Sequence, residues 1–423
     1  MMRKIFGNSL IIFLFISINI SASSTKILIP MDDSQKNHLK SYGIAYYCLD
    51  KNIKVNWLLN YKGGSFCLNF NQEITKECDI RNVSYQIITN QEYKTIINHI
   101  SKEDVNMEVV ILEKKPKIAV YSPKTKQPWD DAVTLALTYS EIEYDIVYDE
   151  EVLSDLLSSY DWLHLHHEDF TGQYGKFYFA YKNASWYKQQ QKDFEATAKK
   201  LGFNKVSELK LAVAKKIKEF TMGGGYLFAM CSATDSYDIA LSVSETDICH
   251  YMFDGDEIDE NYQEKINYNE TFAFENYNIY MNPNEYEFSS IDATKTRKVQ
   301  KEIDYFTLFD FSAKWDQIPT MLCQNHTKTI KGFMGQTTSF KKEFIKSNVL
   351  IMGDNSKLNE AKYIHGKTGK GTWTFYAGHD PEDYQHKIGD PPTDLNLHPN
   401  SPGYRLILNN VLFPAAKKKK RRT

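Results

Sequence analysis

The sequence predicts an α/β protein built around a parallel sheet, with a second α/β unit before it and a β-rich insertion inside it. Short apolar runs alternate with single amphipathic helices, which is the pattern of βαβ units with parallel strands. Between about residues 254 and 344 the pattern changes to polar, aromatic runs that alternate with a period of two, as in residues 276–280. Such alternation is typical of antiparallel strands.

These patterns divide the chain into segments. We predict a signal peptide at 1–23, an N-terminal α/β domain at 24–113, a main α/β domain at 114–253 and 345–416, a β-rich insertion at 254–344 and a basic tail at 417–423. Strands of the N-terminal domain are expected, in parallel, at 26–30, 55–59, 85–88 and 109–112. Strands of the main domain are expected at 117–121, 144–148, 161–166, 226–230, 348–352 and 371–377, with helices at 129–139, 184–200 and 206–221.

The first residues indicate export. Arg3 and Lys4 precede an apolar run at 10–20 and the small residues of 21–23, which is the pattern of a cleaved secretory signal. The run is too short to span a bilayer, and no later stretch is long and apolar enough to do so. We therefore expect a periplasmic or secreted protein without a transmembrane segment after cleavage.

Charge and cysteine content exclude some function classes. The net charge is −3, although basic residues are concentrated in the tail, so the body of the protein is acidic and nucleic acid is not an expected partner. A small molecule, a peptide or a carbohydrate is the expected substrate. The six cysteines contain no C-x-x-C, which argues against a zinc ribbon or a thioredoxin-type site. In an exported protein Cys67 and Cys78, which flank a short polar segment, form the most plausible disulfide.

Cys231 is the most informative residue. A helix, three glycines and an apolar run precede it, and small residues follow, so it is expected at the carboxyl end of a buried strand on a sharp turn into a helix. Open α/β folds keep their sites at that edge, and such elbows expose nucleophiles. The alternative is a free cysteine packed in the core.

The second half of the chain resembles the class I glutamine amidotransferase-like fold, a flavodoxin-like parallel sheet. The resemblance rests on Met230-Cys231-Ser232 and on residues 369–382, which end Gly-His379-Asp-Pro-Glu382. It implies Cys231 as nucleophile, His379 as base and Glu382 as the residue that orients His379. The spacing from His379 to Glu382 is one residue longer than in the family, so Asp380 is the alternative orienting residue. A thiol nucleophile, an imidazole base and an orienting carboxylate suit amide or ester hydrolysis.

A third strand end carries His164-Leu-His166-His167-Glu168-Asp169. His164 and His166 share one face of the strand, and this density of imidazole and carboxylate suits zinc or iron, with His164, His166 and Glu168 as the ligands. The alternative is that these side chains pack in the interior. Four residues of this edge are candidates for substrate binding: His166, His167, Glu168 and Asp235.

Two neighbouring segments allow simpler interpretations. Residues 171–175 are expected either as a mobile flap or as a plain turn. Asp130 and Asp131 open a helix, where carboxylates favour the helix dipole, and no further role is expected of them.

Across its mature length the chain also resembles a group of exported bacterial proteins labelled asparagine synthetase B, through residues 26–32, 57–65, 162–172 and 228–236. Glutamine-dependent asparagine synthetase needs an N-terminal cysteine and an S-G-G-x-D-S loop. Met2 and the glycine-free 232–236 match neither, so asparagine synthesis is not expected.

The function expected is therefore Cys-dependent amide or ester hydrolysis without a cofactor. The alternatives are a non-catalytic carbohydrate- or peptide-binding protein, and a metal-dependent hydrolase that uses the His164, His166 and Glu168 cluster with zinc.

Overall fold

The computed structural model describes residues 25–124 and 130–417 and contains two sheets in a mixed α/β arrangement. The predicted signal peptide and all of the basic tail except Lys417 lie outside the described residues. Within these residues no helix combines the length and the apolar character needed to cross a membrane.

The first sheet has five strands in the order β4-β1-β3-β2-β5. Its elements are β1 (Thr25–Ile29), α1 (His38–Asp50), β2 (Val55–Leu59), β3 (Ser65–Asn69), α2 (Gln72–Ile80), β4 (Gln86–Thr89), α3 (Asn90–Ile100) and β5 (Glu108–Leu112).

Every pairing in this first sheet is antiparallel, so the prediction of parallel βαβ units was wrong. The prediction missed β3, which follows β2 through a tight turn at Tyr61–Gly63 and Gly64 and lies between β1 and β2. Gly63 and Gly64 have φ of 71° and 89°, values that glycine adopts without strain. Although a single helix connects β1 to β2, these two strands are therefore not adjacent in the sheet.

The expected Cys67–Cys78 disulfide is also absent, and the six cysteines are free. Cys67 packs with the residues under α3, whereas Cys78 packs on the other face of the sheet with α1. The sheet itself separates the two thiols.

The second sheet contains ten strands, ordered β11-β10-β13-β14-β15-β9-β8-β6-β7, with β12 paired to β14. The strands are β6 (Ile118–Tyr121), β7 (Asp145–Val147), β8 (Trp162–Leu165), β9 (Tyr226–Met230), β10 (Tyr305–Leu308), β11 (Thr329–Lys331), β12 (Phe340–Lys341), β13 (Leu350–Asn355), β14 (Glu360–Thr368) and β15 (Gly371–Tyr376). Strands β7, β6, β8, β9 and β15 are parallel, as predicted, and their carboxyl ends share one edge.

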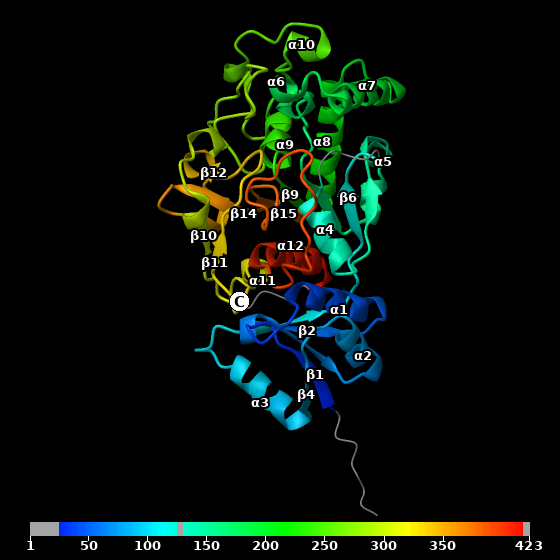
Figure 1. The fold of residues 1–423 in the computed structure, drawn as a ribbon, viewed down its shortest axis with the longest axis vertical. Helices are drawn as coiled ribbons and strands as arrows, with labels where there is room; N and C mark the ends of the chain where they lie inside the picture. The colour runs from blue at the N-terminus through cyan, green and yellow to red at the C-terminus, as the bar shows by residue number, and fades with distance from the viewer. Residues whose placement is uncertain (1–24, 125–129, 418–423) are drawn as a thin grey trace, which may run out of the picture.

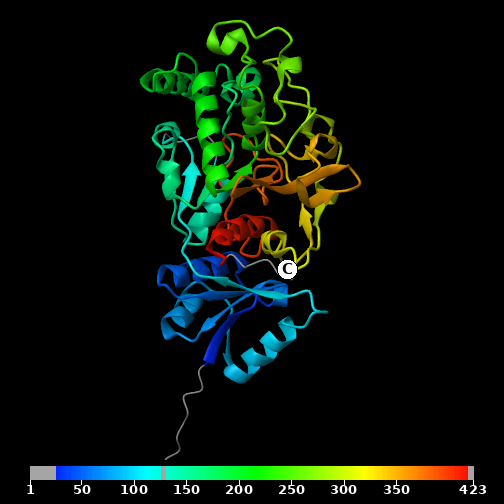
Figure 2. The ribbon, with the colours of Figure 1, turned by 180° about the vertical axis from the view of Figure 1, so that it is seen from behind.

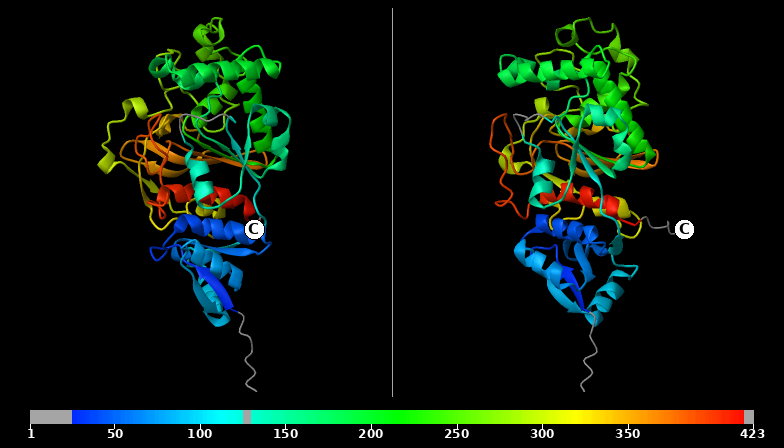
Figure 3. Two further views of the ribbon diagram at one scale, coloured as in Figure 1. Left: turned by 45° about the vertical axis from the view of Figure 1, so that its right-hand side comes forward. Right: turned by 90° about the vertical axis from the view of Figure 1, so that its right-hand side faces the viewer.

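The helices of this part are α4 (Ala132–Tyr139), α5 (Asp149–Leu153), α6 (Tyr178–Tyr181), α7 (Ser185–Lys200), α8 (Val206–Gly223), α9 (Ala233–Ser242), α10 (Tyr251–Asp254), α11 (Gln317–Leu322) and α12 (Pro402–Leu412). Helices α4 and α12 pack together on one face of the sheet, and α8, α9, α5 and α7 lie on the other (Figures 1 and 3).

The segment 254–344 has fewer strands than its alternating pattern predicts. Residues 272–274 and 276–280 make only the isolated bridges of Phe274 with Ile345 and of Ile279 with Ser289. Its regular strands, β10, β11 and β12, extend the main sheet. Loops make up most of this segment. Its aromatic side chains, such as Phe272 and Tyr277, are buried against the main domain and do not belong to a separate sheet.

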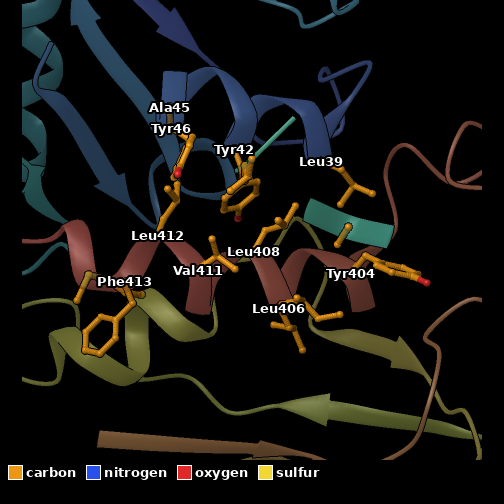
Figure 4. Packing of buried hydrophobic residues seen from close by; sticks show 14 of the residues in the cluster. Leu39, Tyr42, Ala45, Tyr46, Tyr404, Leu406, Leu408, Val411, Leu412 and Phe413 are labelled. Atoms are coloured by element: carbon orange, nitrogen blue, oxygen red, sulfur yellow. The ribbon is translucent and has the colours of Figure 1, made fainter. Parts of the chain in front are cut away.

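The two sheets share one apolar core. Helix α12 lies between the second sheet and α1 of the N-terminal domain, as both ribbon views show (Figures 1 and 2). Leu39 and Tyr42 of α1 face Leu408, Val411 and other residues of α12 in this layer (Figure 4). The N-terminal domain is therefore joined to the main domain through a continuous buried surface.

A buried cation fixes this junction. Arg405 of α12 is fully buried and donates from Nε to the Tyr42 hydroxyl (3.1 Å) and from Nη1 to the Met31 carbonyl (2.9 Å). Its Nη2 donates to the carbonyl of Gly63 in the tight turn, and its Nη1 contacts His326. The guanidinium is thus held by polar atoms of both domains, and no carboxylate of the described residues pairs with it.

Replacing Arg405 tests this junction. Arg405→Met should lower the free energy of unfolding by about 2 kcal/mol or more, because the Met31 and Gly63 carbonyls lose a buried donor. Chemical denaturation measures the change, with Lys76→Met, at an exposed position of α2, as the control. A variant as stable as the wild type would contradict the role given to Arg405.

His38 and His326, stacked at 4.3 Å in the same junction, should make stability fall in acid. Burial, and then the Arg405 cation, lower the pKa of His38 to about 3 and that of His326 to about 4. Below the unfolded value of 6.5 the unfolded chain binds protons that the folded chain does not, so stability decreases as the pH falls from about 6.5 towards 4. His38→Gln should make this decrease shallower, by up to about 1.4 kcal/mol per pH unit. Denaturation midpoints at pH 7, 6 and 5 measure it, and an unchanged slope would refute the assignment.

Candidate functional site

Asp131 is the centre of the site. It is the N-cap of α4, and its Oδ1 accepts hydrogen bonds from the backbone amides of Val133 (2.8 Å) and Thr134 (2.9 Å). Its Oδ2 lies 3.1 Å from Nε2 of His164 and 3.1 Å from Nδ1 of His166. The cap therefore fixes one oxygen and directs the other towards two imidazoles.

Strand β8 supplies both imidazoles. His164 lies within the strand and His166 just beyond its end, two residues apart, so both side chains are on one face of the sheet. Nδ1 of His164 is 3.2 Å from the carbonyl oxygen of Phe228 on β9, and the ring stacks against Trp162. A proton on Nδ1 of His164 donates to this carbonyl and leaves the lone pair of Nε2 facing Asp131.

A second group of side chains adjoins the first. His379, after β15, has its Nδ1 2.9 Å from Nε2 of His166. His386 lies further along the same loop, with Nδ1 2.9 Å from Asp383 Oδ2 and Nε2 2.8 Å from Asp130 Oδ1. The structure thus brings the ends of β8 and β15 together at the edge that the sequence predicts.

Several polar atoms here are buried without an aligned hydrogen bond. Among the described residues these are Nδ1 of His166, both carboxylate oxygens of Asp130 and Nε2 of His386. Three sets of possible ligands occur here, and the ligand atoms of each set lie within 4.8 Å of one another: Asp131, His164 and His166; Asp130, His379 and His386; and the more exposed Asp383, His386 and Asp390. All three sets have the residue types that hold a metal ion.

The electrostatics favour an anionic Asp131 and neutral side chains of His164 and His379. Burial acts to raise the pKa of Asp131, but His164 and His166 outweigh it and hold the pKa of that carboxyl well below its ordinary value. Burial lowers the pKa of His164, and burial together with His166 and His167 lowers the pKa of His379. His386 differs, because its contact with Asp130 raises its pKa to about 9.

The third predicted ligand, Glu168, is not part of any of these sets. Its Oε2 accepts a hydrogen bond from the Tyr148 hydroxyl (3.3 Å), and burial raises the pKa of this carboxyl to about 7. Asp131 faces His164 and His166 in its place. The ring of His167 lies 4.9 Å from that of His166 and 6.1 Å from that of His379, at the margin of the cluster.

The residues expected to orient His379 are used elsewhere. Glu382 Oε2 lies 3.2 Å from Nδ1 of His398. Asp380 binds its own loop, accepting from the amide of Glu382 (2.8 Å) and the hydroxyl of Thr393 (2.7 Å). The loop after His379 turns both carboxylates away from the His379 imidazole. The hydrogen-bond partner of this imidazole is His166 instead.

Cys231 occupies the predicted elbow, with a left-handed φ of 51° and its amide donating to the Gly378 carbonyl (3.2 Å). Only 4% of the residue is exposed. Burial raises the pKa of its thiol to about 12, although the backbone amides of Ser232 and Gln336 act to lower it. Burial therefore favours the protonated thiol over the thiolate that a nucleophile needs.

Asp235 lies on the same side as Cys231. It accepts a hydrogen bond from the Thr337 hydroxyl (2.8 Å), and burial and Asp292 raise the pKa of its carboxyl well above the ordinary value. The segment 171–175 is a buried turn and not a flap, because Asp169 accepts from the Gly175 amide and Gln336 donates to the Gly175 carbonyl.

The residues that sequence reasoning missed are Asp130, Asp131 and His386. Asp130 and Asp131 follow the first strand of the parallel sheet, so their position after a strand end was a usable signal. The sequence carries no comparable signal for His386, because the position of this residue depends on the path of an irregular loop.

The comparisons with known proteins give little for this site. No protein-family model and no curated protein matches the chain. Cytoplasmic protein STM3548 from Salmonella typhimurium is 11% identical with a TM-score of 0.34, covering 72% of this chain and all of that one. Cytoplasmic protein STM1381 from Salmonella typhimurium LT2 is 13% identical with a TM-score of 0.35, covering 71% and 100%. A catalytic mutant of Gan42B, a GH42 β-galactosidase from G. stearothermophilus, is 10% identical with a TM-score of 0.25, covering 62% and 27%. These likenesses are too weak to carry an argument about function.

The state of Cys231 can be measured directly. At pH 7.5 the native protein should react with iodoacetamide at Cys231 no faster than a free thiol of pKa about 8.5, because burial keeps the sulfur protonated. Peptide mass spectrometry follows the labelling, with His379→Ala as the comparison. Rapid labelling that His379→Ala abolishes would restore the Cys231–His379 pair as the catalytic site.

Proposed function

We propose that this protein is a metal-dependent hydrolase whose zinc ion is held by Asp131 Oδ2, His164 Nε2 and His166 Nδ1. The observation that carries the proposal is one carboxylate oxygen that lies 3.1 Å from a ring nitrogen of each of two histidines. One of these nitrogens, His166 Nδ1, has no aligned hydrogen bond among the described residues.

Proton counting supports a cation at this point. A neutral His164 that donates from Nδ1 to the Phe228 carbonyl turns the lone pair of Nε2 towards the Asp131 carboxylate. Two acceptor atoms at 3.1 Å repel each other unless a positive charge lies between them. A metal ion on Nε2, Nδ1 and Oδ2 satisfies all three atoms at once.

The set fits zinc. Imidazole nitrogens and a carboxylate oxygen are ordinary zinc ligands, and three protein ligands with a fourth position left open are the composition of catalytic zinc sites. The carbonyl of Phe228 orients His164 as an outer partner, as zinc-binding histidines require. In such a set zinc lowers the pKa of a water molecule and polarises a substrate carbonyl.

The topology supports the same location. The parallel strands β7-β6-β8-β9-β15, numbered along the chain, have the order 2-1-3-4-5 of flavodoxin-like sheets. This order supports the further proposal that the main domain has a class I glutamine amidotransferase-like fold. Ligands of such sheets bind where the strand order reverses, which here is between β6 and β8. Asp131 follows β6 and both histidines come from β8.

The second candidate is Cys-dependent amide or ester hydrolysis at Cys231. The left-handed φ of 51° favours it, because a strained residue at a strand-to-helix turn is typical of a nucleophile. Hydrolysis that survives chelation but is lost in Cys231→Ser would establish this candidate over the metal centre. Export to the periplasm or the medium stays a prediction in either case.

Zinc affinity tests the main proposal. His166→Ala should weaken zinc binding about 100-fold or more, because loss of even an outer partner of a ligand costs 10 to about 100-fold. Competition with a fluorescent chelator at pH 7.5 measures the affinity. His99→Ala, at an exposed histidine in the last turn of α3, is the matched control and should bind as the wild type does. Equal affinity of both variants would refute the assignment.

A further inference from the structure

We propose that Asp130, His379 and His386 form the substrate-binding side of the centre and not a second metal site, and that they bind an amide group. This inference rests on the proposed zinc ion at Asp131, His164 and His166. Beyond the proposed zinc site, it specifies how many ions bind there and which chemical class of substrate the site takes.

The contact between His166 and His379 limits the number of ions to one. Nε2 of His166 and Nδ1 of His379 are 2.9 Å apart, so a single proton lies between them. When Nδ1 of His166 binds the metal, its Nε2 must carry the proton and donate it to His379. A neutral His379 then carries its own proton on Nε2, and a protonated nitrogen cannot bind a metal ion.

Asp130, Asp131 and His379 form the side of the cluster that lies nearest to solvent. The exposed fraction is 13% for the Asp131 side chain, 10% for the Asp130 side chain and 9% for His379. His164, His166 and the His386 side chain are exposed by 2% or less. A molecule that reaches Asp131 from solvent therefore also meets His379 and Asp130. These two residues are placed to orient a substrate.

The donors and acceptors of this group match an amide. His379 offers the Nε2–H, which can donate to a carbonyl oxygen. Asp130 offers Oδ2, a buried carboxylate oxygen without an aligned hydrogen bond among the described residues, whereas its Oδ1 lies 2.8 Å from Nε2 of His386. An amide N–H satisfies such an oxygen, whereas an ester presents only further acceptors.

The reaction that follows is hydrolysis of a carbon–nitrogen bond. The oxygen of water bonds to the carbonyl carbon, the C–N bond breaks, and a proton from the water passes to the leaving nitrogen. The products are a carboxylic acid and an amine, and no oxidant or reductant is needed.

Zinc stoichiometry tests the first part. After dialysis against zinc and removal of the excess, the full chain should hold one ion per molecule by elemental analysis. Asp130→Asn and His386→Ala should also hold one, provided that their circular dichroism spectra match the wild type. Two ions in the wild type, or loss of zinc in either variant, would overturn the proposal.

Ligand binding tests the second part. In saturation-transfer NMR on the zinc-loaded chain, acetamide should bind more tightly than methyl acetate, by about fivefold to tenfold, the factor for one net hydrogen bond. Asp130→Asn should remove that preference, and Glu302→Gln, at an exposed position of the insertion, should retain it. No binding of acetamide, equal binding of both probes, or a preference that survives in Asp130→Asn would overturn the amide assignment.

The two failures can be told apart. A chain that holds no zinc refutes the proposed function itself. A chain that holds one ion but shows no amide preference refutes only this inference.

Discussion

The Asp131 carboxylate is the interaction on which the candidate site depends. One carboxylate oxygen accepts hydrogen bonds from backbone amides in the first turn of α4, and the other oxygen faces His164 and His166. A helix cap is a local interaction, set by residues next to one another in the chain, whereas the histidines come from a strand paired between β6 and β9. The carboxylate therefore connects the start of a helix to the middle of a parallel sheet, and it can do so only where the carboxyl ends of β6 and β8 are adjacent.

The rest of the main domain supports that adjacency. The ring of His164 packs between Trp162 and the strand β9, so the apolar core fixes the imidazole before any ion binds. A single hydrogen bond between His166 and His379 then orients the His379 ring. Beyond the sheet, α12 and the buried Arg405 join the N-terminal domain to the same core. His164 thus lies within a strand, whereas His166 and His379 follow strand ends and Asp131 caps a helix.

Sequence reasoning predicted the parallel strands and the edge at which polar residues gather, because buried strands between amphipathic helices have a strong periodic pattern. It identified His164 and His166 from their positions at a strand end, and His379 through the resemblance to the class I glutamine amidotransferase-like fold. It did not predict that Asp131 replaces Glu168, since the direction of a side chain in a loop depends on partners such as Tyr148 that are distant in sequence. Nor did it predict the antiparallel first sheet, because the short hairpin strand β3 has no helix to mark it. The Cys231 elbow was predicted in position, but its burial against Gln336 depends on an insertion whose path the sequence does not show.

The central claim is that one ion binds between Asp131, His164 and His166. Diffraction from crystals of the zinc-loaded chain, with data at both sides of the zinc absorption edge, locates the ion directly. The account predicts one anomalous peak at about 2.0–2.2 Å from Asp131 Oδ2, His164 Nε2 and His166 Nδ1. A peak bound instead by Asp130, His379 and His386, or no peak at the carboxyl edge of the sheet, would contradict it.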